Sequence, residues 1–181
     1  MLDDENSVIH AAERYLGLPR CGGDPANLKK VYDLLNKSKP DWGTFSYDTI
    51  TKMTSGDVDV TQTWNGAAFR MRKQVPTVKY AYPKEGIEGW MDNVAVLKDA
   101  PNMENAKAFQ NFVMDPENAA LISAFAGYDN GITGSDKFLP ADFAQSPEIK
   151  MPAGGPTPEF VQPCPKDVLE MYNKIWTNLR K

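Results

Sequence analysis

The chain has 181 residues, of which 41% are hydrophobic and 24% charged, a composition typical of a globular protein of one or two domains. The formal net charge of −4 and the isoelectric point of about 5.1 leave no basic surface of the kind that nucleic-acid binding requires. No apolar run approaches the roughly 20 residues of a membrane-spanning helix, and no basic-then-apolar signal segment stands at the N-terminus.

The first part of the chain carries three helix patterns. Residues 3–17 begin with aspartates and end at a glycine, which is typical of a capped helix. Residues 24–39 repeat this pattern with an Asp-Pro start, which suits the N-cap and the first helical position. A shorter helix is predicted over residues 48–57. The apolar side chains of the second helix share one face, and they are Leu28, Val31, Leu34 and Leu35.

Three strands are predicted in the middle of the chain, over residues 58–64, 77–83 and 93–98. Each is rich in β-branched or aromatic residues, and the first alternates between apolar and polar positions. A turn and a short helix over residues 65–74 separate the first two. Because strands alternate with helices, the sequence predicts an α/β fold.

The last part of the chain is predicted to be mainly helical. Two consecutive helices span residues 103–114 and 116–127, and a terminal helix covers residues 165–181. Between them, residues 129–165 are rich in Pro, Gly and Ser and are too many for an ordinary loop. Such segments are often functional, or they cross between lobes.

Few residues offer catalytic or metal chemistry. His10 lies in the first predicted helix, where a structural or surface role is the usual one. Cys21 and Cys164 form no C-x-x-C pair, and one histidine with two distant cysteines cannot build a typical zinc site without carboxylates. Their spacing leaves open both a disulfide and two inert thiols. No dinucleotide loop, phosphate loop, nucleophile elbow or H-E-x-x-H motif is present, so the case for an enzyme is weak.

Large aromatic residues fall at the ends of predicted elements. Trp64 ends one strand, Trp90 precedes another, and Tyr128 follows a helix. Clefts of α/β proteins open at such ends. Asp92 lies two residues after Trp90, and in an extended segment these side chains point to the same face. The alternative for each aromatic residue is a place in the core.

An indole beside a carboxylate suits an amine. A cation over an aromatic face gains about 0.5–2 kcal/mol, and a carboxylate accepting from an ammonium group adds about 1.5–3 kcal/mol. One such pair falls short of the roughly 8 kcal/mol of a micromolar site. Several groups must therefore converge on the ligand.

Three segments occur in a distinctive order: "WNGAAFRMR", then "YPKEGIEGWMDNVAVLKDAPNMENAKAFQNFVMDPENAA", then "GY". In order and spacing, the chain from Met1 to Lys181 resembles the periplasmic spermidine/putrescine-binding proteins of ABC importers. The resemblance implies the two-lobed α/β architecture of type II periplasmic binding proteins. It also implies a polyamine in the cleft, with its chain between aromatic rings and its ammonium groups on carboxylates.

Ligand-binding residues carried over from this family fall on positions along the whole chain: Trp64, Trp90, Asp92, Tyr128, Asp4 and Gln162. Two departures bear on the ligand. Ser7 stands where the family has a carboxylate, and Ala67 stands where one branch has an aspartate. The resemblance therefore favours a polyamine and leaves open another cationic solute.

The resemblance begins partway through the second lobe, so the expected fold is incomplete at its N-terminal side. Residues 1–86 and 134–181 would belong to the second lobe, and residues 87–133 to part of the first. The signal peptide and the rest of the first lobe have no counterpart. Because Cys21 and Cys164 would share a lobe in an oxidising compartment, the resemblance favours a disulfide between them.

The resulting hypothesis is a periplasmic, monomeric, non-catalytic component of an ABC transporter. It would need no cofactor, and its partners would be a polyamine and the permease subunits in the membrane. The alternatives are a binding protein for another cationic or amino-acid-like solute, and a truncated form with little binding of its own.

Overall fold

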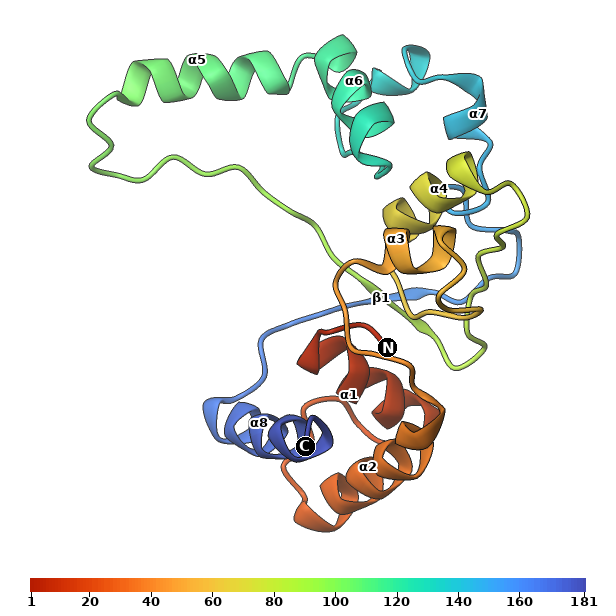
Figure 1. The fold of residues 1–181 in the computed structure, drawn as a ribbon. Coiled ribbons are helices and arrows are strands. Elements are labelled where there is room, and N and C mark those ends of the chain that lie inside the picture. The colour runs from red at the N-terminus through yellow and green to blue at the C-terminus, as the bar shows by residue number, and fades with distance from the viewer. The chain divides into compact units, whose positions relative to one another are not determined.

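The computed structural model describes residues 1–181, which form mainly helices and one short sheet (Figure 1). The chain divides into two compact units. Unit 1 comprises Met1–Thr63, Tyr82–Gly89 and Pro156–Lys181, and unit 2 comprises Trp64–Ala81 and Trp90–Gly155. The α-helices are α1 (Glu5–Tyr15), α2 (Pro25–Ser38), α3 (Thr49–Thr54), α4 (Asn65–Gln74), α5 (Met103–Val113), α6 (Pro116–Ala126), α7 (Ala141–Ala144) and α8 (Lys166–Leu179), and short 3-10 helices lie at Lys39–Asp41 and Ser135–Lys137.

Unit 1 is built on α1, α2 and α8, which pack together (Figure 1). The first two helices begin as predicted, because Asp4 accepts from the Ser7 N–H at 2.7 Å and Asp24 accepts from the Ala26 N–H at 2.8 Å. The core between the three helices contains Val8, Ile9, Leu28, Val31, Tyr172, Trp176 and Leu179.

Cys21 and Cys164 are joined by a disulfide at the edge of this core. His10, which is 2% exposed, lies beside it and packs edge-on against the Tyr172 ring at 5.8 Å. His10 is therefore a buried residue of unit 1 rather than a surface histidine.

The only sheet is a parallel pair within unit 1, formed by β1 (Ile87–Gly89) and β2 (Pro158–Phe160). The strands predicted over residues 58–64, 77–83 and 93–98 are wrong, because none of these segments pairs with another. A strand needs a neighbour to satisfy its backbone groups, and alternation in sequence does not supply one. The segment 129–165 is not one loop either, since it contains α7 and β2.

Unit 2 contains α4, α5, α6 and α7. Phe69 of α4 meets Phe143 of α7 edge-on at 5.2 Å, and both are buried. Beside them, Arg72 forms two hydrogen bonds, at 2.7 and 2.8 Å, with the almost fully buried carboxylate of Glu148. These contacts fix α4 against the segment that follows α7.

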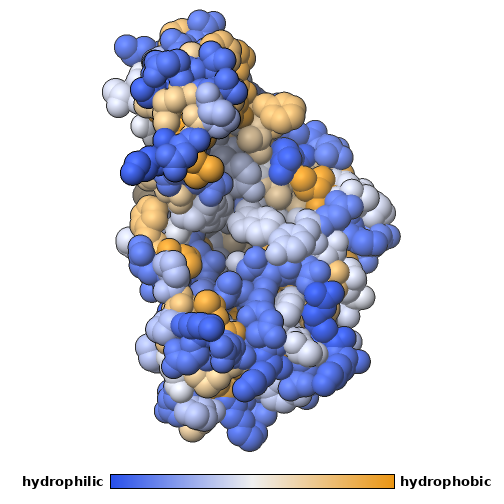
Figure 2. Space-filling view, turned by 90° about the vertical axis from the view of Figure 1, so that its left-hand side faces the viewer, coloured by the Kyte–Doolittle hydropathy of each residue, from blue (hydrophilic) through white to orange (hydrophobic).

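The face shown in Figure 2 is mostly hydrophilic and carries separate hydrophobic areas. Helix α5 has no buried residue, and Phe109 and Phe112 on it are 57% and 63% exposed. Phe125 of α6 is 88% exposed. None of the eight helices is both long and apolar enough to cross a lipid bilayer.

Candidate functional site

Two of the aromatic residues singled out from the sequence, Trp90 and Tyr128, contact each other within unit 2. Their rings meet edge to face, with centroids 6.1 Å apart and planes at 74°. Trp90 is 44% exposed, and Tyr128 is partly buried. An exposed indole held by a second ring can receive a ligand on its free face.

Two glycines determine where Tyr128 lies. Gly127 ends α6 with φ of 82°, in the left-handed region. The Tyr128 ring then covers Gly66, where a Cβ atom would lie only 2.5 Å from the ring. Trp64, the N-cap of α4, stands two residues before Gly66. The start of α4 and the ring of Tyr128 are therefore in direct contact.

Asp92 brings negative charge to the same cluster. Burial raises the pKa of Tyr128, and the Asp92 carboxylate raises it further, while the Arg70 guanidinium acts in the opposite direction. Asp92 itself is exposed. Trp90 and Tyr128, which are in contact, and the exposed carboxylate of Asp92, two residues after Trp90, are together called the aromatic cluster of unit 2.

The remaining residues inferred from the resemblance, Asp4 and Gln162, belong to unit 1. Asp4 caps α1 with one oxygen and accepts from the Tyr47 hydroxyl with the other, at 3.3 Å. Gln162 is exposed, and its backbone carbonyl accepts from Arg20 at 2.6 Å. Asp4 and Gln162 form no hydrogen bond with each other, and each already has a role within unit 1.

The structure shows what surrounds Ser7 and Ala67, the two positions that depart from the family pattern. The Ser7 hydroxyl donates to Glu88 at 3.4 Å, so a carboxylate lies next to the position where the sequence lacks one. That carboxylate is engaged by His10 and Arg14. Ala67 is 4% exposed, and an aspartate there would be buried in α4.

Sequence reasoning missed Tyr47 and Arg70. Tyr47 is 59% exposed and hydrogen-bonds to Asp4, although the two residues are far apart in sequence. The charge of the Arg70 guanidinium lowers the pKa of Tyr128, against the larger effect of burial. Tyr47 lies just before α3 and Arg70 lies inside α4. Neither belongs to a distinctive sequence pattern, so the sequence alone did not indicate a role for them.

Unit 2 also has an open apolar groove of about 650 Å³. Residues 94–101 line it together with Phe109 and two other residues of α5. None of the predicted ligand-binding residues lies in this groove. Its apolar lining offers little to an ammonium group, and the aromatic cluster remains the better candidate.

A family model, that of the bacterial extracellular solute-binding proteins, matches residues 1–152. The chain belongs to this family. The resemblance inferred from the sequence is thereby confirmed, and members of the family are defined as solute-binding proteins rather than by a reaction.

Two relatives in this solute-binding family show how far the similarity extends. The chain is 28% identical to the spermidine/putrescine-binding periplasmic protein 1 of Haemophilus influenzae, over 99% of this chain and 50% of the relative. It is 31% identical to the spermidine/putrescine-binding periplasmic protein of Escherichia coli, over 82% of this chain and 41% of the relative. The chain therefore spans about half the length of the relatives it matches.

A solved structure supports the fold. A putative spermidine/putrescine ABC transporter protein from Listeria monocytogenes superposes with a TM-score of 0.87 at 23% identity, over 99% of this chain and 56% of that one. The fold class predicted from the sequence, that of periplasmic binding proteins, is confirmed.

Proposed function

We propose that the protein containing this chain is the extracytoplasmic solute-binding component of an ABC transporter and that it binds a polyamine. The observation that carries the proposal is the cluster of Trp90, Tyr128 and Asp92, which joins aromatic faces to a carboxylate in a chain whose relatives bind spermidine and putrescine. The protein would act in the periplasm, without catalysis or cofactor, and deliver its ligand to permease subunits.

The cluster suits an alkylammonium ligand for two reasons. Methylene groups gain free energy on leaving water for an aromatic face, and the ammonium group is attracted by the π-electrons of the ring. The exposed carboxylate of Asp92, two residues after Trp90, would supply a charged acceptor for the ammonium group. Trp64, Asp4 and Gln162 complete the proposed ligand set.

The lobe assignment remains part of this proposal. Residues 1–86 and 134–181 would lie in one lobe of the whole protein and residues 87–133 in the other, with the ligand in the cleft between the lobes. Since the chain spans about half the length of its relatives, we expect these 181 residues alone to bind polyamines more weakly than about 1 mM.

Substitutions in the cluster test the proposal. In a protein of the relatives' length that contains this chain, Trp90→Ala or Asp92→Asn should each weaken polyamine binding by about 1–3 kcal/mol, because each removes one interaction with the cation. Isothermal titration calorimetry with spermidine and putrescine measures the change.

Two substitutions provide matched controls. Phe125→Ala removes an exposed aromatic ring elsewhere in unit 2, and Asp99→Asn removes an exposed charge from the same segment as Asp92. Both should leave affinity unchanged. If Trp90→Ala and Asp92→Asn behave like these controls, the cluster is an ordinary part of the protein surface and the assignment fails.

A different cationic or amino-acid-like solute is the alternative ligand. Ser7 and Ala67 favour it, because each replaces a carboxylate that polyamine-binding relatives are expected to use. Titration with single-amine and amino-acid ligands beside the polyamines distinguishes the two. Preference for a ligand with one ammonium group would support the alternative.

A further inference from the structure

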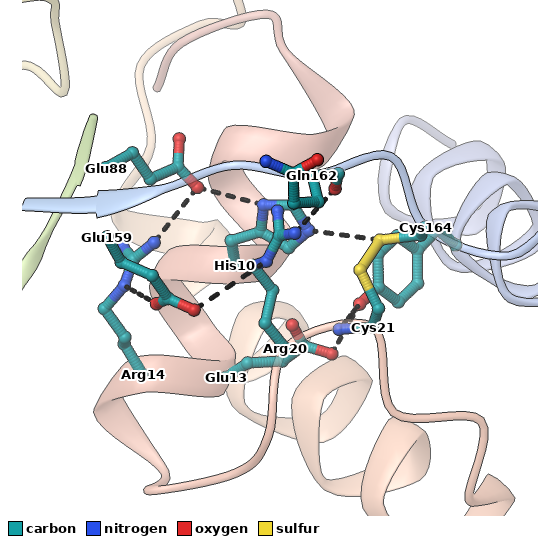
Figure 3. The surroundings of a disulfide bond; sticks show 10 residues. His10, Glu13, Arg14, Arg20, Cys21, Glu88, Glu159, Gln162 and Cys164 are labelled. Carbon is teal, nitrogen blue, oxygen red and sulfur yellow. Dashed lines mark hydrogen bonds and ion pairs between the residues drawn. A yellow bond between two sulfur atoms is a disulfide. The ribbon is translucent and has the colours of Figure 1, made fainter. Parts of the chain in front are cut away.

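We propose that reduction of the Cys21–Cys164 disulfide creates a binding site for a thiolate-preferring divalent metal ion such as Zn²⁺. The ligands would be the two cysteine sulfurs and Nε2 of His10, all within unit 1 (Figure 3). The proposal does not depend on polyamine binding. It gives a role to the Nε2 atom of the buried His10, which faces Cys164 and takes no part in the proposed solute site.

The distances fit a tetrahedral zinc ion. The candidate ligand atoms of His10, Cys21 and Cys164 all lie within 4.8 Å of one another, and His10 Nε2 is 3.7 Å from Cys164 Sγ. A nitrogen and a sulfur bound to one tetrahedral zinc ion are about 3.6 Å apart, from Zn–N and Zn–S distances of roughly 2.05 and 2.3 Å. The histidine and one sulfur therefore already have the required separation.

The second sulfur needs only a local rearrangement. Two sulfurs on one tetrahedral zinc ion are about 3.8 Å apart, so the sulfurs must separate once the bond between them is broken. The Cα atoms of Cys21 and Cys164 are 5.3 Å apart. Rotation about the Cα–Cβ bonds can therefore separate the sulfurs without moving the backbone.

The opposite side of the imidazole is held as metal-binding histidines usually are. His10 Nδ1 lies 2.9 Å from Glu88 Oε1, so Nε2 is directed at the sulfurs (Figure 3). Arg14 donates to the same Glu88 oxygen at 3.1 Å. A carboxylate on the second ring nitrogen fixes the tautomer and raises the basicity of the ligating nitrogen.

A buried carboxylate, that of Glu13, lies on the Cys21 side of the three ligand atoms without joining them. Glu13 is 2% exposed, and its Oε2 atom is buried without a hydrogen-bond partner. Its Oε1 accepts from the Tyr172 hydroxyl at 2.6 Å, and that hydroxyl in turn accepts from the Cys21 N–H at 3.1 Å. Glu13 is not among the three ligand atoms that lie close together, so a water molecule would complete the tetrahedron.

The site is controlled by redox state. In the oxidised protein both sulfurs are used in the S–S bond and cannot act as thiolates. A dithiol or phosphine reductant supplies two electrons, which break this bond, and two protons complete the thiols. Zn²⁺ then displaces those protons and binds the thiolates, with His10 neutral.

Cobalt titration of the full chain tests the proposal, because Co²⁺ reports tetrahedral thiolate coordination by its visible and near-ultraviolet absorption. Protein reduced with a phosphine should show these bands saturating at one equivalent, and added Zn²⁺ should abolish them. Oxidised protein should show none. Calorimetry at neutral pH in two buffers should record the release of about two protons as Zn²⁺ binds.

Variants separate a preformed site from metal binding by two free thiols. Glu88→Gln should weaken Co²⁺ binding by about 10- to 100-fold, and His10→Gln should weaken it further. Lys29→Gln, which changes an exposed charge in the same unit, should have no effect. The proposal would be overturned if Glu88→Gln and the unaltered protein bound Co²⁺ with equal affinity. It would also be overturned if the oxidised and reduced forms bound Co²⁺ equally well. Proton release is measured on the unaltered, reduced protein, so it does not depend on how well the variants fold. If no protons are released as Zn²⁺ binds, the proposal is also overturned.

Discussion

Tyr128 owes its position to two residues without side chains. Its ring occupies the space beside Gly66 that a Cβ atom would need, and Gly127 before it adopts φ of 82°. Because neither Gly66 nor Gly127 has a side chain, α4 and the end of α6 can come into close contact. The aromatic cluster of unit 2 therefore depends on residues that would not themselves touch a ligand.

Replacement of Gly66 tests this dependence. Gly66→Ala should displace the Tyr128 ring and lower the free energy of unfolding by about 1–3 kcal/mol, since the new methyl group overpacks a filled site. Urea denaturation followed by Trp fluorescence measures the loss. Gly131→Ala is the matched control, because a Cβ atom at Gly131 has nothing within 4 Å. Equal stability of the two variants would contradict the packing described.

A buried carboxylate in unit 2 makes the stability of that unit depend on pH. Burial raises the pKa of Glu148, but the hydrogen bond and the charge of Arg72 outweigh burial and lower the pKa overall. A carboxylate with a lowered pKa stabilises the fold above its unfolded pKa of roughly 4.3. That contribution is lost as the pH falls through the pKa of the folded state.

Glu148→Gln should therefore cost about 3 kcal/mol of stability at pH 7, because it leaves Arg72 without its charged partner. The difference from the unaltered protein should shrink as the pH is lowered below about 4. Asp142→Asn removes an exposed pair with Lys73 and should leave the stability almost unchanged. Denaturation curves from pH 7 to pH 3 measure both effects, and a pH-independent difference would argue against the ion pair.

Among the secondary-structure elements, helices could be predicted from the sequence and strands could not. Helix α2 begins at Pro25 because Asp24 and its neighbours specify a cap within a few residues. The strands Ile87–Gly89 and Pro158–Phe160 are distant in sequence, and their pairing depends on how the chain folds between them. Local alternation at 58–64 carries no information about such a partner.

The cap of α2 yields a prediction for a single element. Asp24→Ala should lower the free energy of unfolding by about 1 kcal/mol, because the Ala26 N–H loses its acceptor. Asp24→Ser should retain most of the stability, since a serine hydroxyl can cap in the same way. Thermal denaturation of both variants provides the comparison. A loss of equal size in both would show that the charge of Asp24 matters more than its cap.

For the whole molecule, the sequence predicted the family and led to a hypothesis for the ligand class, while the structure supplied the contacts among residues. Trp90 and Asp92 could be singled out because an extended segment puts them on one face. The contact between Trp90 and Tyr128 could not be predicted, because it joins distant segments. Tyr47 beside Asp4 was missed for the same reason.

Calorimetric titration tests the central proposal most directly. A protein of the relatives' length that contains these residues is titrated with spermidine, putrescine and a panel of amino acids and anions. The account predicts saturable polyamine binding at micromolar or tighter dissociation constants, about 8 kcal/mol or more, weakened by Trp90→Ala. Saturable binding of only a neutral or anionic solute would contradict it.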